Sequence, residues 1–445
     1  MDELRRAADL LVADPPAPAA SLEDLTRRNA RRRNRRRAFG GAVALVVLIA
    51  VSVVAVSRPS TDEASVVTEA KVSSGRLAIA TANGVTLIDE HDGVVAEVAL
   101  GFPPISLSWS PNGRWVAALA EGRAEIVARD GKEHRAVSTL RLESVQWVGP
   151  ETLLVDSALG VFELEPAGVP SEVGSIDGLR SPDGKRLAWT DDKVGSSIVV
   201  GEPDGSNPVR LGQLPGGQLP EASGGVMLRG WSPDARWIIY LAYATTSASL
   251  AQDGVPLYAV RVADGFAFRM GVTLDYDDWI QWSPDGETML FVDGEGRFLT
   301  QRKVLRACDL DVLQCTEVET PPEASSFDPA WSPDGSRIAF VQVGAGGVPG
   351  EEFHGELVTA DPSGANRHTF REDPRGVLHP MWTADGAALL ALRIVESDPA
   401  RVTVERFSSQ GGPGRELASF TIPGSMLKGY SAHMTPPMAW SASSP

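Results

Sequence analysis

The stretch that decides the fold is WSPDGSRIAFVQV, which runs from Trp331 to Val343. Copies of its first five residues recur along the chain at intervals of 33 to 58 residues. The clear copies are WSPNG at Trp109, RSPDG at Arg180, WSPDA at Trp231, WSPDG at Trp282 and WTADG at Trp382, and the degenerate ones are WVGPE at Trp147 and WSASS at Trp440. Seven of the eleven tryptophans occupy this one repeat position, so the chain is an array of similar units.

Strand-like sequence follows each copy. After the turn at Pro333 to Gly335 come RIAFVQV and ELVTAD, which are rich in the β-branched and aromatic residues typical of strands. Each unit has room for about four short strands between its Asp-Gly turns. Four antiparallel strands at a period of roughly 40 to 50 residues predict the blade of a β-propeller.

The two ends of the array are complementary. The first segment, GRLAIATA from Gly75, begins with outer strands and has no Trp-containing strand before it. The missing inner strand is present at the other end, in PPMAWSASS from Pro436. We therefore predict an all-β, eight-bladed β-propeller whose last blade joins three N-terminal strands to one C-terminal strand, which removes open sheet edges. Seven blades are the alternative, if the short unit from Trp147 to Arg180 does not form a blade.

These units resemble the TolB-type, WD-repeat-like propeller repeat, on the basis of WSPDG, the IAF-like strand that follows it, and the turn DPSGAN from Asp361 to Asn366. The resemblance covers about residues 75 to 443 and implies the propeller fold. Its motifs are specific for the fold and say little about function, because the family includes periplasmic binding proteins, sensor ectodomains and the propeller caps of peptidases.

The segment before the array has a different composition. Residues 1–37 contain ten arginines and six acidic residues, although the whole chain has a net charge of −17. Residues 38–57 carry no charge, and as a helix these twenty residues would be about 30 Å long, enough to cross a bilayer. The Arg-rich flank predicts an anchor with the N-terminus in the cytoplasm, a polar stalk at 58–74 and an extracytoplasmic propeller at 75–445. A cleaved signal peptide is the alternative, and the acidic balance argues against a nucleic-acid partner.

The repeated residues have structural explanations. A Trp at one fixed position in each blade fits packing between sheets better than a sugar-binding set of aromatics. The repeated Asp-Gly pairs fit tight turns better than calcium ligands, because calcium requires six to eight converging oxygens. The sequence contains no G-x-S-x-G motif, phosphate loop or zinc motif, so we expect no catalytic motif, metal or cofactor.

The two cysteines, Cys308 and Cys315, lie between two predicted strands of one blade. A disulfide across a hairpin suits an extracytoplasmic location and would stabilise the fold by about 2.5 kcal/mol. A reactive or metal-binding pair is the alternative, but no third and fourth ligand lies nearby in the sequence.

One group of polar residues stands out from the repeat. In four consecutive blades, the segment that approaches the innermost strand carries Asp or His, and closure of the ring would bring these side chains to one part of the funnel mouth. Such an acidic site could hold a basic peptide or a cation, and solvated turn residues are the simpler alternative. The residues are Asp275, Asp277, Asp278, Asp328, His379 and His433.

The sequence thus predicts a single-pass membrane protein whose extracytoplasmic propeller binds a protein, a peptide or an envelope polymer, as a scaffold or a sensor. Rigid blades with variable loops provide a binding surface without catalytic residues. The alternative is an extracytoplasmic hydrolase or lyase that uses two funnel carboxylates as acid and base.

Overall fold

A computed structural model describes most of the chain from Gly75 to Ser441. The described residues are 75–137, 142–157, 160–166, 171–174, 178–191, 197–213, 225–243, 254–295, 302–344, 355–370, 377–397, 400–422, 428–430, 433–435 and 438–441. The chain divides into two compact units, Met1–Lys71 and Val72–Pro445, and all described residues belong to the second. None of the helices among them is long and apolar enough for a membrane span, and the predicted tail, span and stalk lie outside the described residues.

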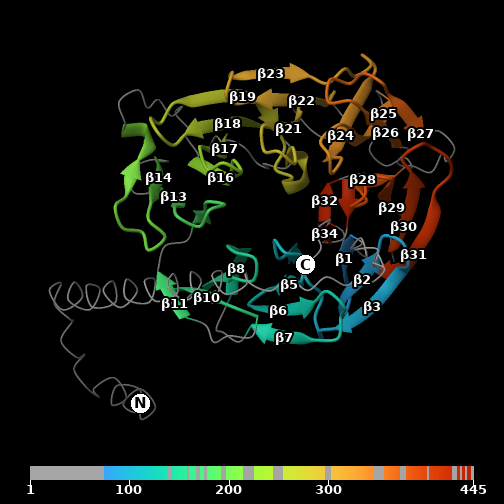
Figure 1. The fold of residues 1–445 in the computed structure, drawn as a ribbon, viewed down its shortest axis with the longest axis horizontal. Helices are drawn as coiled ribbons and strands as arrows, with labels where there is room; N and C mark the ends of the chain where they lie inside the picture. The colour runs from blue at the N-terminus through green and yellow to red at the C-terminus, as the bar shows by residue number, and fades with distance from the viewer. Residues whose placement is uncertain are drawn as a thin grey trace, which may run out of the picture. The chain divides into compact units, whose positions relative to one another are not determined.

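The described residues form eight four-stranded antiparallel sheets, which follow one another around a ring (Figure 1). The first sheet after the closing blade consists of β4 (Ser106–Trp109), β5 (Trp115–Ala120), β6 (Arg123–Ala128) and β7 (His134–Val137), and the second of β8 (Leu142–Trp147), β9 (Leu153–Ser157), β10 (Gly160–Leu164) and β11 (Ser171–Gly174). The third consists of β12 (Leu179–Arg180), β13 (Leu187–Asp191), β14 (Ser197–Gly201) and β15 (Val209–Arg210), and the fourth of β16 (Gly225–Trp231), β17 (Trp237–Tyr243), β18 (Val255–Arg261) and β19 (Ala267–Thr273). The unit from Trp147 to Arg180 therefore does contribute a complete blade, β8 to β11.

Three further blades complete the series before the ring closes. They consist of β20 (Ile280–Trp282), β21 (Thr288–Asp293), β22 (Val304–Asp309) and β23 (Gln314–Glu317), then β24 (Ala324–Trp331), β25 (Ile338–Gly344), β26 (Glu356–Ala360) and β27 (His368–Phe370), then β28 (Leu378–Trp382), β29 (Ala388–Ser397), β30 (Ala400–Ser408) and β31 (Arg415–Ile422). Two 3₁₀ turns, η2 (Leu211–Gln213) and η3 (Asp277–Trp279), and a two-stranded sheet, β32 (Lys428–Tyr430) with β33 (His433–Thr435), lie outside these blades.

The closing blade joins the two ends of the array, as the sequence predicts. Its order is β3 (Gly93–Ala99), β2 (Gly84–Asp89), β1 (Arg76–Thr81) and β34 (Met438–Ser441). Strand β34 pairs antiparallel with β1, with Leu77 opposite Trp440, and Figure 1 shows the last strand beside the first. The eight-bladed propeller and its mode of closure are thus confirmed.

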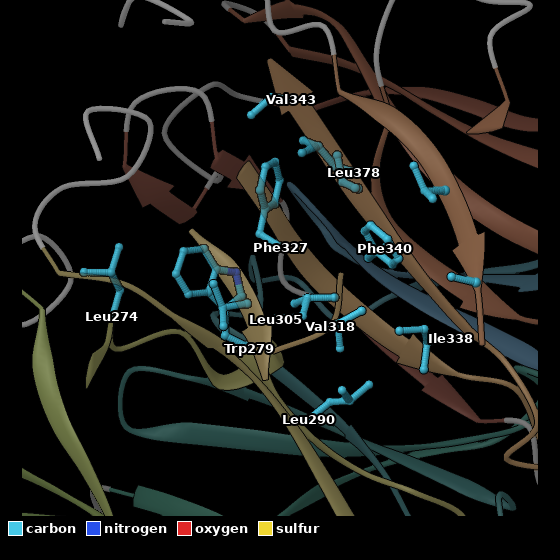
Figure 2. Packing of buried hydrophobic residues seen from close by; sticks show 14 residues of the cluster. Leu274, Trp279, Leu290, Leu305, Val318, Phe327, Ile338, Phe340, Val343 and Leu378 are labelled. Carbon is cyan, nitrogen blue, oxygen red and sulfur yellow. The ribbon is translucent and has the colours of Figure 1, made fainter. Parts of the chain in front are cut away.

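The hydrophobic core lies between neighbouring blades. One cluster combines Leu290 and Leu305 of the blade β20–β23 with Phe327 and Phe340 of the next blade, and all four side chains are fully buried (Figure 2). Because each blade presents an apolar face to each neighbour, a single blade has no core of its own. Closure of the ring is therefore required to cover the faces of the first and last blades.

Four of the repeated tryptophans hold their inner strand to the preceding one through a hydrogen bond. The indole N–H of Trp231 donates to the carbonyl oxygen of Leu179 at 2.9 Å, and that of Trp382 donates to Ala330 at 3.2 Å. Trp109 and Trp147 do the same toward Ala439 and Ser108. In each case the acceptor is the residue directly before the repeat residue of the preceding blade. The prediction that this Trp packs between sheets is confirmed.

The repeated aspartates belong to tight turns. Ser232 Oγ donates to Asp234 Oδ1 at 2.6 Å, and the same hydroxyl accepts from the backbone N–H of Trp237 at 2.9 Å. In the equivalent turn, the hydroxyl of Ser181 and then the backbone N–H of Lys185 lower the pKa of Asp183 to about 2. Each of these carboxylates accepts bonds from its own turn, which explains the motif without a cation.

Candidate functional site

A cavity of about 780 Å³ lies where four consecutive blades present their inner strands. Strands β20, β24, β28 and β34 each contribute lining residues, and their tryptophans form much of the apolar wall. The tryptophans are Trp282, Trp331, Trp382 and Trp440. The charged side chains of the lining are Asp278, Asp328 and His379. Apolar walls with a few converging polar groups are typical of ligand sites, and the volume falls in their usual range of roughly 300 to 1,000 Å³.

Two of these charged residues, Asp328 and His379, occupy one equivalent position, three residues before the repeat Trp. This position holds Trp279, Asp328 and His379 in three consecutive blades. At Asp328 and His379 the strands bulge, and both residues have positive φ angles of 52° and 48°. A proline follows each of them and normally favours extended backbone, so the left-handed conformation is strained. The bulges turn these two side chains out of the regular alternation of the strand.

Asp328 links the three blades. Its Oδ1 accepts from the indole N–H of Trp279 at 3.1 Å, and its Oδ2 accepts from the backbone N–H of His379 at 3.1 Å. Only 3% of the residue is exposed. The indole of Trp279 is itself fully buried in the core beside Phe327 (Figure 2). Asp328 therefore acts mainly as an internal brace, because both oxygens bond to neighbouring blades.

His379 lies between two carboxylates. Its Nδ1 is 2.6 Å from Asp278 Oδ2 and 3.7 Å from Asp328 Oδ2. Burial of the imidazole opposes its charge, but the charges of Asp328 and Asp278 and the hydrogen bond with Asp278 outweigh this and raise the pKa of His379 to about 9. His379 is accordingly an imidazolium at neutral pH and neutralises one of the two negative charges.

Asp278 is the accessible member of the cluster. It lies in η3, and 38% of its side chain is exposed, compared with 5% for His379. The two buried members thus orient an exposed carboxylate at the cavity wall. An exposed carboxylate beside apolar walls can accept hydrogen bonds from a cationic group of a ligand.

The three side chains could also be considered as metal ligands, because one ligand atom from each lies within 4.8 Å of the others. However, Asp328 already accepts two hydrogen bonds, and Asp278 and His379 form a short ion pair. A divalent ion would have to displace the proton of the imidazolium. The described geometry therefore fits a hydrogen-bonded ion cluster better than a metal centre.

The remaining residues of the predicted funnel group lie elsewhere. Asp275 forms an ion pair with Arg229 of β16 at 2.6 Å, so its charge is compensated apart from the cluster. The backbones of Asp277 and His433 lie in η3 and β33, but their side chains are outside the described part of the structure. Of the six predicted residues, Asp278, Asp328 and His379 are the ones brought together.

Trp279 was not among the predicted site residues, although its spacing gives a signal. It lies three residues before Trp282, as Asp328 lies three before Trp331. Aligning the blades on this Trp would have placed its side chain next to Asp328. Gln281 and Met381 also line the cavity and carry no comparable signal.

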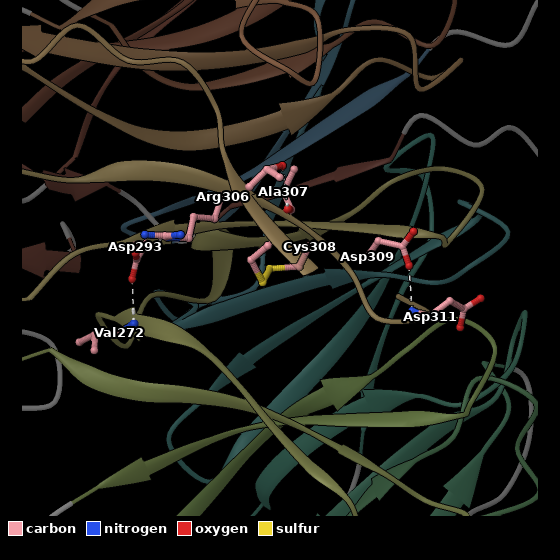
Figure 3. The surroundings of a disulfide bond; sticks show 9 residues. Val272, Asp293, Arg306, Ala307, Cys308, Asp309 and Asp311 are labelled. Atoms are coloured by element: carbon pink, nitrogen blue, oxygen red, sulfur yellow. Dashed lines mark hydrogen bonds and ion pairs between the residues drawn. A yellow bond between two sulfur atoms is a disulfide. The ribbon is translucent and has the colours of Figure 1, made fainter. Parts of the chain in front are cut away.

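The two cysteines form a disulfide, as predicted. Cys308 and Cys315 face each other across β22 and β23, and their sulfur atoms are 2.00 Å apart (Figure 3). The neighbouring ion pair between Arg306 and Asp293 joins β22 to β21 (Figure 3). The disulfide thus belongs to the outer strands of its blade, and it is not part of the cavity lining.

No family model matches the chain. A segment of 114 residues is 26% identical to the uncharacterized peptidase YuxL of Bacillus subtilis (strain 168), which corresponds to 25% of this chain and 16% of that protein. The match therefore covers a small part of the relative, and the activity of that protein does not transfer with it.

Solved structures resemble the chain in fold. A eukaryotic initiation factor has a TM-score of 0.51 at 11% identity, and the similarity covers 84% of this chain and 99% of the other. TolB from Acinetobacter baumannii has a TM-score of 0.33 at 16% identity, over 69% of this chain and 66% of the other. AztD from Citrobacter koseri has a TM-score of 0.47 at 13% identity, over 83% and 98%. At these identities the similarities concern the fold alone.

Proposed function

We propose that this protein is a binding protein, and that its propeller holds part of a protein, peptide or envelope polymer in the central cavity. The observation that carries the proposal is the cavity of about 780 Å³ in which four inner strands present apolar walls and one exposed carboxylate.

The geometry supports binding better than acid–base hydrolysis. A two-carboxylate mechanism needs an acid and a base that both reach the substrate. Asp328 is 3% exposed and bonds to Trp279 and His379, so it is poorly placed for that role. Among the described side chains of the cluster, Asp278 is the accessible carboxylate, and it is paired with an imidazolium.

We also propose that residues 38–57 anchor the protein in a membrane, with residues 1–37 in the cytoplasm and the propeller outside. The support is the uncharged twenty-residue segment after an Arg-rich tail, together with the disulfide, which suits an oxidising compartment. Alkaline phosphatase fused after Pro445 should be active in cells, and the same enzyme fused before Met1 should be inactive. The reverse pattern would contradict this topology.

Site-specific cross-linking tests the binding function. A photo-reactive amino acid in place of Gln281, which lines the cavity, should cross-link the full-length protein in cells to a discrete partner. The same amino acid in place of Val312, which is 64% exposed and does not line the cavity, is the matched control. Equal products at both positions, or none at Gln281, would argue against a ligand in the cavity.

A further inference from the structure

The ion cluster at the cavity wall has an uneven distribution of charge. Asp328 and His379 are buried and engaged with each other and with Trp279, whereas Asp278 is exposed. The three described side chains, two carboxylates and one imidazolium, together carry a net charge of about −1. The described lining contains no Lys or Arg, so a ligand can supply the compensating positive charge.

We propose that the cavity binds a lysine side chain of a partner polypeptide, whose ammonium group contacts Asp278 and whose aliphatic stem lies against the tryptophan and proline wall. This inference rests on the proposed binding function and adds the chemical class of the ligand. Charge complementarity selects a cation, and the apolar lining selects a cation that is carried on a hydrocarbon stem.

The geometry of Asp278 favours ammonium over guanidinium. Arginine binds carboxylates most strongly when its planar fork contacts both oxygens at once. One oxygen of Asp278, Oδ2, is already held by His379 Nδ1 at 2.6 Å. An ammonium is a compact donor that needs only one acceptor oxygen, so it fits the remaining part of the carboxylate.

The wall provides a suitable surface for the stem. Pro329 and Pro380 directly follow the bulged residues Asp328 and His379. Trp331 and Trp382 lie three residues after the same bulged residues. All four residues line the cavity. Indole faces also attract nearby ammonium groups through cation–π interactions. The same wall would gain little from a bare metal ion, which has no apolar part to bury.

Calorimetric titration of the full-length protein tests this inference. The probes are the peptide acetyl-Ala-Ala-Lys-Ala-Ala-amide and two analogues in which arginine or Nε-acetyl-lysine replaces the lysine. We expect the lysine peptide to bind about tenfold more tightly than the acetylated one, and more tightly than the arginine peptide. Equal affinity of the three peptides, or preference for arginine, would overturn the inference.

Three variants place the contact. Asp278→Asn removes the charge but keeps an acceptor for His379, and it should weaken binding of the lysine peptide about tenfold. Glu356→Gln removes one charge from an exposed position on β26 outside the cavity lining and should leave binding unchanged. An unchanged thermal midpoint shows that Asp278→Asn is folded, and Asp278→Glu should restore binding in part. Equal effects of Asp278→Asn and Glu356→Gln would overturn the assignment.

The outcomes separate this inference from the binding function. If no lysine peptide binds but Gln281 still cross-links to a partner, the ligand class is wrong and the cavity remains a binding site. If Mn²⁺ or Zn²⁺ alone raises the thermal midpoint, and His379→Gln abolishes the increase, the cluster is a metal site and the lysine assignment is overturned.

Discussion

Two sets of aspartates in this propeller share a side chain and differ in what they contact. The turn aspartates, such as Asp234 and Asp334, are bonded by a serine two residues earlier and by backbone of the same turn. The cavity aspartates contact residues of other blades. Asp278 pairs with His379, 101 positions on and two blades further along the ring, and Asp328 bonds to Trp279, 49 positions back in the preceding blade.

This difference separates the residues that make the fold from those that make the site. A turn needs the same local bonds in every blade, so its aspartate recurs with the repeat. A binding site exists once, so it requires residues that depart from the repeat at equivalent positions. The position three residues before the Trp varies from blade to blade, and in three consecutive blades it holds Trp279, Asp328 and His379.

The largest expected effect comes from Asp328→Ala. It should lower the free energy of unfolding by about 4 kcal/mol, because it leaves Trp279 and His379 without their buried acceptor and removes a buried charge partner. Urea unfolding measures this loss. Asp334→Ala, in a turn, should cost only about 1 kcal/mol. Equal losses would erase the distinction between the two sets.

The pH dependence of stability should come next in size. The pKa of His379 is raised to about 9 in the folded protein, from 6.5 in the unfolded chain. Its charged form therefore stabilises the fold by about 3 kcal/mol below pH 6.5, and this contribution is lost as the pH rises through 9.

Comparison of wild type with His379→Gln in urea, at about pH 6 and again at about pH 10, measures this contribution. The stability difference between the two proteins should shrink by about 3 kcal/mol at the higher pH. Asp183 in a turn, whose pKa is lowered to about 2, loses its bonds only in acid and does not contribute in this window. A constant difference would show that His379 is not charged in the folded state.

Trp231→Phe should have an intermediate effect. The change removes the indole bond to Leu179 and leaves a small cavity between two blades, which together cost about 2 kcal/mol. Because Trp231 does not line the described cavity, binding of the lysine peptide should be unchanged. Trp382→Phe, by contrast, should reduce both stability and binding. Loss of binding in Trp231→Phe would mean that the ligand site extends beyond the four lining blades.

The smallest effect is expected for Ser232→Ala. This change removes one hydroxyl that donates to Asp234 and accepts from the backbone N–H of Trp237, at a cost of about 1 kcal/mol. Thermal unfolding measures it. A loss as large as that of Asp328→Ala would show that the turns hold the blades together more than the packing between them does.

The fold could be predicted from the sequence because most blades repeat the same turn motif and the same strand pattern. The spacing of the Trp residues gave the blade count, and the unpaired strand at Pro436 to Ser444 gave the closure with Gly75 to Thr81. These inferences need only local turns and strand patterns.

The candidate site could be predicted only in part. Its location in four consecutive blades followed from the repeat, and three of the six residues meet there. The pairing of Asp275 with Arg229 and the role of Asp328 as a brace could not be anticipated. The role of Asp328 depends on the bulges at Asp328 and His379, which have positive φ angles. Both contacts depend on the distance between inner strands, which no single blade determines.

Carboxyl footprinting tests most directly the claim that Asp278, unlike the turn aspartates, serves a ligand. Carbodiimide coupling of glycine ethyl ester to the wild-type protein would be followed by mass spectrometry, with and without the lysine peptide. We predict that the peptide slows modification of Asp278 several-fold and leaves Asp234, Asp285 and Asp334 unaffected. Protection of none of these residues, or equal protection of all four, would contradict the account.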